Sequence, residues 1–171
     1  TDGSIGWIAA ARTPIRKGHD GLLPIPGSEA FDWKGHLAVA DLPQRFNPKE
    51  GFIATANHKS LPKDSPHSLG YVFDAPSRFR RLSGALACKE KWTLEDFKAL
   101  QQDHVSLPAR ELVGLLSMIE FEDRSLRERA RSLMGWDGSL GVDSMEGTLY
   151  AMWLKELKSA LLGQHLPKDL H

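Results

Sequence analysis

The stretch GFIATAN at residues 51–57 joins a short apolar run to an asparagine, and this pattern predicts a β-strand that ends at Asn57. A second β-type run, IGWIAAAR at 5–12, follows the turn-forming DGS at 2–4. Loops rich in proline and glycine separate the two runs, so they cannot form a hairpin. A connection of this length is typical of a functional loop, or of a segment that wraps over a larger body.

From about Ser77 onward the apolar residues recur at helical spacing instead. Thr93 and Asp96 have the side-chain types of a capping box, which predicts that a helix begins there. Pro108 suits the first turn of the next helix, because its missing N–H would have no partner at that position. The second half of the chain is therefore expected to be helical.

Two more helices are expected near the end of the chain. Ser125 is a candidate cap for a helix through Leu133, and the longest helix is expected from near Ser144 to Leu162. Gly163 and Pro167 would stop that last helix. The fold class expected from the whole pattern is α+β, with a strand and loop segment at 1–76 and a helical subdomain at 77–171.

Composition excludes several classes of partner and site. The chain has 22 Lys and Arg against 22 Asp and Glu, so no net charge favours nucleic acid or an anionic membrane. Cys88 is the single cysteine, which excludes an internal disulfide. No apolar run approaches the ~20 residues that span a bilayer. The seven histidines form no His-x-x-x-His pair, so no zinc site is predicted.

The order of the less common residues along the chain is more informative than any single motif. In sequence this chain resembles the penicillin acylase family of N-terminal-nucleophile hydrolases over nearly its whole length. The segments that carry the resemblance are DGSIGW at 2–7, RTPIR at 12–16, HDGLLPIPG at 19–27, DWKG at 32–35, GFIATAN at 51–57, RFRRL at 78–82 and WDG at 136–138. Each segment alone is weak evidence, but their collinear order is not.

This resemblance implies that the chain is an internal piece of the larger subunit of such an acylase, with part of its αββα fold. Family members cleave a linear amide, as in a penicillin, an acyl-homoserine lactone or a lipopeptide, through an N-terminal serine whose own amino group is the base. The expected partners are the smaller subunit and the rest of the larger subunit. Many relatives are exported by bacteria, so a periplasmic or secreted location is expected.

The resemblance also implies two site residues. Asn57 matches the family's oxyanion-hole asparagine, and Arg78 matches the arginine that orients it. Each residue has a plainer interpretation as well. An asparagine that closes a strand is commonly a turn residue that tolerates left-handed backbone, and Arg78 begins a basic helical turn whose side chains could simply be solvated or ion-paired.

The chain departs from the family pattern in two places and lacks one expected ligand. His58 stands where many relatives have a second asparagine, and Phe73 stands where a tryptophan is usual. Relatives often bind a structural calcium ion through a backbone oxygen matching Gly21 and a carboxylate near Ser68. No carboxylate occurs from 65 to 72, so neither a complete metal site nor any cofactor is expected in this chain.

Thr1 raises a competing possibility, because an N-terminal threonine can itself be a nucleophile. The sequence after it resembles an internal strand of the family, so the chain alone is expected to be inactive and to lack the catalytic nucleophile.

A different class of function stays open at this point, that of a stand-alone interaction module with the same fold. Unpaired strand edges also predict self-association of the isolated chain.

Overall fold

The computed structural model describes residues 2–61, 65 and 69–167. The chain divides into two compact units, Thr1–Lys91 and Trp92–His171. Helical structure begins at Ser77, where the sequence period changes, but this first helix belongs to the first unit. The expected domain boundary between residues 76 and 77 stays a prediction.

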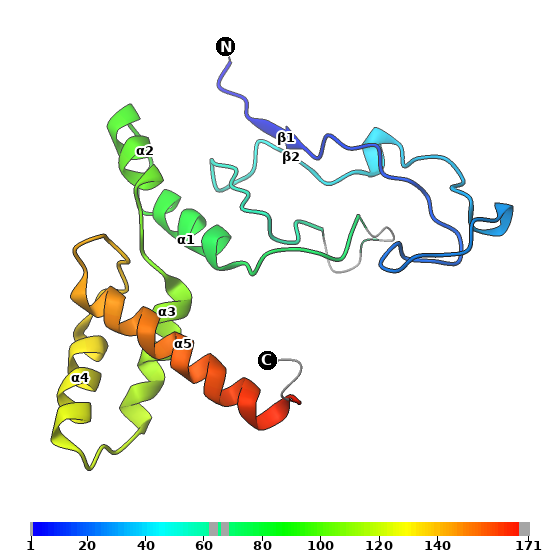
Figure 1. Ribbon diagram of the computed structural model, residues 1–171. Helices are drawn as coiled ribbons and strands as arrows, with labels where there is room; N and C mark the ends of the chain where they lie inside the picture. Colours follow the sequence, from blue (N-terminus) through cyan, green and yellow to red (C-terminus); the bar gives the residue numbers. More distant parts are fainter. Residues whose placement is uncertain (1, 62–64, 66–68, 168–171) are drawn as a thin grey trace. The chain divides into compact units, whose positions relative to one another are not determined.

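The first unit is built around a small antiparallel sheet (Figure 1). Strand β1 (Gly6–Ile8) pairs with β2 (Gln44–Phe46), with Trp7 opposite Arg45. The side-chain oxygen of Asn47 accepts a hydrogen bond from the Ile5 N–H at 2.8 Å, which continues the pairing beyond β2. Two short 3-10 turns, η1 (Glu29–Phe31) and η2 (Val39–Asp41), shape the intervening loops, and α1 (Ser77–Leu86) follows.

The strand predictions were largely wrong. Residues 51–57 form no strand, and the predicted strand at 5–12 is reduced to the three residues of β1. A run with strand composition becomes a strand only when a neighbour completes its hydrogen-bonded ladder. At the end of this run the Asn57 carbonyl accepts a hydrogen bond from the N–H of Asp74, which precedes α1 and lies in no strand. Strand β2 was missed because prolines flank it and predict a loop.

The second unit is helical, as predicted. Thr93 and Asp96 form the predicted capping box of α2 (Leu94–Gln101), and Pro108 lies in the first turn of α3 (Leu107–Gly114). The chain continues through η3 (Leu115–Met118), α4 (Arg124–Gly135) and α5 (Met145–His165). Helix α5 begins after Ser144 as expected but runs three residues beyond Leu162, because a glycine in right-handed backbone weakens a helix without ending it.

Helices α3, α4 and α5 enclose the core of the second unit (Figure 1). The buried residues of this core are Ala109, Val113, Leu116, Ala130, Leu133 and Tyr150. Tyr150 is only 6% exposed, and its ring lies 5.6 Å from that of Trp136 and 6.4 Å from that of Trp153. The face of α5 that carries Tyr150 and Trp153 therefore belongs to this core, and α5 packs on α4.

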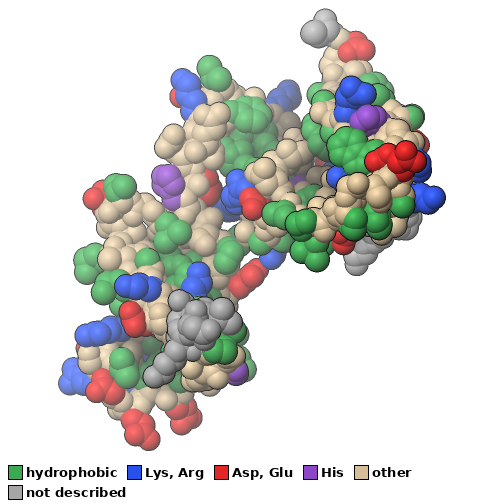
Figure 2. Space-filling model, turned by 45° about the vertical axis from the view of Figure 1, so that its right-hand side comes forward, with side chains coloured by type: hydrophobic (Ala, Val, Ile, Leu, Met, Phe, Trp, Pro, Cys, Tyr) green, Lys and Arg blue, Asp and Glu red, His purple; other side chains and the backbone are tan. Residues whose placement is uncertain are grey.

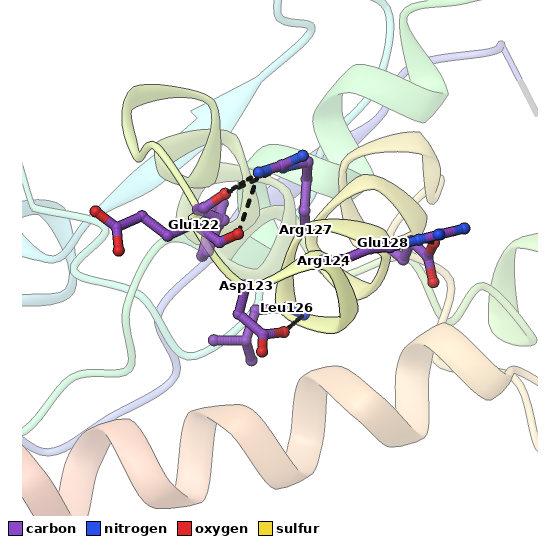
Figure 3. Close-up of polar contacts among 7 residues, drawn as sticks. Glu122, Asp123, Arg124, Leu126, Arg127 and Glu128 are labelled. Atoms are coloured by element: carbon purple, nitrogen blue, oxygen red, sulfur yellow. Dashed lines mark hydrogen bonds and ion pairs between the residues drawn. The ribbon is translucent and has the colours of Figure 1, made fainter.

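The N-terminus of α4 is held by two polar contacts (Figure 3). A side-chain oxygen of Asp123 accepts the Leu126 N–H at 2.8 Å, so Asp123 is the cap and the prediction of Ser125 was wrong. Ser125 lies inside the helix, because the extended backbone that a cap requires occurs at Asp123. The Arg127 guanidinium turns back and donates to the Phe121 carbonyl at 2.6 Å, which fixes the approach of the preceding loop.

Replacing Asp123 with alanine is expected to lower the free energy of unfolding of the chain by about 1 kcal/mol, because one backbone donor of the first turn loses its acceptor. Urea unfolding followed by circular dichroism measures the change. Asp123→Asn is the matched control, since asparagine caps a helix about as well as aspartate. An alanine variant as stable as the parent chain would show that the cap contributes nothing here.

Candidate functional site

Asn57 lies where the apolar run ends, in a backbone conformation that few residue types adopt. Its φ is +59°, in the left-handed region that asparagine tolerates better than most residues. The residue before it, Ala56, is buried at 7% exposure, whereas the Asn57 side chain is exposed. The plain interpretation of Asn57 as a turn residue thus describes its backbone correctly, and its side chain makes a separate contact.

Arg78 holds the Asn57 side chain. It comes from the first turn of α1, and its Nη2 donates to the Asn57 side-chain oxygen Oδ1 at 3.0 Å. The same nitrogen lies 3.3 Å from the Ala56 carbonyl oxygen. The structure therefore brings together the two residues that the sequence singled out, although they are 21 positions apart.

Asp74 is a third member of this cluster that the sequence analysis missed. Its carboxylate pairs with Arg78 at 2.5 Å, and its backbone N–H donates to the Asn57 carbonyl at 2.9 Å. Both side chains of the ion pair are about 60% exposed (59% and 60%), so solvent screening leaves the pair little stabilising energy. The ion pair therefore orients the Arg78 side chain rather than stabilising the fold. The sequence signal that would have indicated Asp74 is its position four residues before the oppositely charged Arg78.

The cluster decides which end of the Asn57 amide is presented to a ligand. A guanidinium is only a donor, so the amide oxygen must face Arg78 and the amide nitrogen Nδ2 must point elsewhere. Among the described residues no hydrogen bond is made by that nitrogen. The arrangement therefore presents an exposed, neutral N–H donor, which is the kind of group that stabilises charge developing on an oxygen.

A pocket of about 390 Å³ lies in the first unit beside the segment that carries Asn57, although Asn57 itself does not line it. Thr55 and His58, on either side of Asn57, line it together with Trp7 from β1 and Arg45 from β2. The His58 ring stacks on Phe79 of α1, with ring centroids 3.9 Å apart. The lining of the pocket is thus more apolar than polar, and it includes the basic side chains of Arg45 and Lys59.

Neither a metal cluster nor a membrane-spanning helix occurs in the part of the chain that the structure describes. No three His, Cys, Asp or Glu side chains gather there to hold an ion. None of the described helices is both long and apolar enough to cross a bilayer. Thr1 and the Ser68 position considered for calcium lie outside the described residues.

Comparison with known proteins identifies the family of the chain. The family model of penicillin amidase matches residues 1–171. An acyl-homoserine lactone acylase QuiP of Pseudomonas fluorescens is 30% identical over 90% of this chain and 21% of its own length. Penicillin acylase 2 proenzyme of a Pseudomonas species is 30% identical over 91% and 20%, and penicillin G acylase of Escherichia coli is 34% identical over 80% and 17%. The chain thus spans about a fifth of the length of these relatives.

A solved structure gives the fold. The thermostable penicillin G acylase of Alcaligenes faecalis superposes with a TM-score of 0.74 at 21% identity, covering 97% of this chain and 32% of that one. The predicted fold class, an α+β part of an N-terminal-nucleophile hydrolase, is confirmed. Together with the match of the family model over all 171 residues, this shows that the chain belongs to the penicillin amidase family.

Proposed function

We propose that this chain is part of an acylase that hydrolyses a linear amide, and that Asn57 donates a hydrogen bond to the oxyanion of the tetrahedral intermediate. The observation that carries the proposal is the 3.0 Å bond from Arg78 to the Asn57 amide oxygen, which leaves the amide nitrogen as the outward donor. The acylase names of the relatives support the reaction class.

The chemistry follows from the charge that develops during amide hydrolysis. When a nucleophile attacks the carbonyl carbon, the carbonyl oxygen becomes negative, and a donor already in place stabilises it without further reorganisation. Arg78 adds a fixed positive charge behind the amide and polarises its N–H bonds. The attacking serine and its amino-group base would come from another segment of the acylase, as the resemblance implies.

The exposed surface supports an extensive protein partner. Large apolar side chains reach the surface in both units (Figure 2), among them Leu23, Phe46, Val72, Met118 and Val142. Exposed apolar area on this scale commonly marks surfaces that pack against other protein. The partner proposed is the remainder of the acylase, in a periplasmic or secreted bacterial enzyme that acts on a penicillin, an acyl-homoserine lactone or a lipopeptide.

The isolated chain is expected to show no amidase turnover, whereas the intact acylase is expected to hydrolyse at least one acyl amide, because the resemblance implies that the nucleophile and its base lie in another segment. The measurement compares the two proteins at equal concentration on a phenylacetyl amide, a long-chain acyl-homoserine lactone and an acylated peptide.

Turnover by the purified chain that disappears in Thr1→Val would contradict this assignment, and it would make Thr1 the nucleophile. An intact acylase inactive on every amide but still able to bind a protein partner would favour the interaction-module alternative.

A further inference from the structure

The turn that carries Asn57 contacts α1 through two consecutive residues rather than one. Arg78 holds the Asn57 side chain, and the next residue of the helix, Phe79, stacks on the next residue of the turn, His58. The two rings are 3.9 Å apart between centroids and are inclined by only 20°. Two adjacent positions of the turn are thus matched to two adjacent positions of the first helical turn.

The position of the His58 ring is not explained by a hydrogen bond to its buried ring nitrogen. Its Nδ1 atom is buried and has no partner among the described residues. A buried polar atom without a partner costs free energy, so the contact that holds this ring must be the stack itself. Both rings are half-buried, and each therefore restricts the rotation of the other.

Asn57 needs such a second contact. Its side chain is exposed, and the Arg78–Asp74 pair that holds it is more than half exposed on both sides. Hydrogen bonds at that exposure exchange readily with water, so on their own they leave the amide free to rotate. A stack one residue later fixes the peptide plane that follows Asn57, and with it the left-handed backbone at φ +59°.

We propose that His58 is a positioning residue for the oxyanion donor, acting through its stack on Phe79 to hold the backbone and amide of Asn57. This inference rests on the proposed role of Asn57. It assigns to His58 no contact with substrate and no proton transfer. The aromatic ring carries the role, and the imidazole nitrogens do not.

The test uses the intact acylase. His58→Ala is expected to lower kcat about tenfold with little change in KM, because a misplaced donor weakens the transition state more than the ground state. His58→Phe keeps the ring and is expected to stay within about twofold of the parent kcat, with unchanged or higher thermal stability. His36→Ala is the matched control, since that ring lies in the same unit and meets Trp33 edge-on rather than stacking on Phe79.

A double-mutant cycle separates this role from a general loss of structure. In an Asn57→Ala background, His58→Ala is expected to cost no further kcat, since the donor that it positions is gone. A loss in His58→Phe as large as that in His58→Ala would overturn the inference, as would an undiminished loss in the Asn57→Ala background. If Asn57→Ala is slow while His58→Ala is normal, only this inference fails; if Asn57→Ala is normal, the proposed function itself fails.

Discussion

Asn57→Ala in the intact acylase is expected to lower kcat by about a hundred- to a thousandfold, equivalent to the loss of about 3 to 4 kcal/mol of transition-state stabilisation. The alanine removes the amide nitrogen that Arg78 orients outward. Because that bond strengthens only as the carbonyl oxygen becomes negative, KM is expected to change much less. Steady-state kinetics on an acyl amide, with acylation followed in a single turnover, measure both quantities.

Asn47 supplies the matched control. It is the other non-glycine residue with positive φ in the described chain, at +42°, and its side-chain oxygen accepts the Ile5 N–H. Asn47→Ala therefore imposes similar backbone strain in the same unit without touching Arg78. Equal kinetic losses in the two alanine variants would attribute the effect to folding, and a nearly normal kcat in Asn57→Ala would remove Asn57 from the mechanism.

The largest loss of stability is expected at Tyr150. Tyr150→Ala would leave a cavity between α4 and α5 and remove both contacts with Trp136 and Trp153, at a cost of about 3 to 5 kcal/mol in the free energy of unfolding. Urea unfolding of the chain, followed by tryptophan fluorescence, measures the change. A loss below about 1 kcal/mol would show that the core closes around the gap and that Tyr150 does not organise it.

Tyr150→Phe is the control, and it adds a dependence on pH. Burial raises the pKa of the Tyr150 hydroxyl above its ordinary value of 10.0, because the low-dielectric core disfavours the phenolate. A pKa raised in the folded state contributes stability that is fully present below the unfolded pKa and is lost as pH rises through the folded one. The chain should therefore lose stability above roughly pH 10, and Tyr150→Phe should lose less.

Helix starts were largely predictable from sequence because their determinants are local. The Thr93–Asp96 box and Pro108 lie within one turn of the backbone that they stabilise, so three or four residues contain the whole interaction. At α4 the prediction of Ser125 failed, because the cap is Asp123, two residues earlier. The position of that cap depends on where the preceding loop places a residue with extended backbone.

The strands and the third member of the site were not predictable in this way. Residues 51–57 have strand composition, but a ladder depends on a neighbour that local sequence does not specify. Asn57 and Arg78 were found through the resemblance, whereas Asp74 acts partly through its backbone N–H, which every residue type except proline supplies. Sequence reasoning therefore found the side chains with distinctive chemistry and missed the main-chain contact that aligns them.

The left-handed backbone at Asn57 means that the requirement to fold and the requirement to catalyse restrict this position differently. Glycine, aspartate and asparagine all accept this conformation, so each of them would satisfy the requirement to fold. Of the three, only asparagine offers a neutral N–H group to the reacting oxygen while turning its carbonyl to Arg78. In a library of substitutions at this position, selection for soluble protein should retain glycine, aspartate and asparagine, and selection for turnover should retain asparagine.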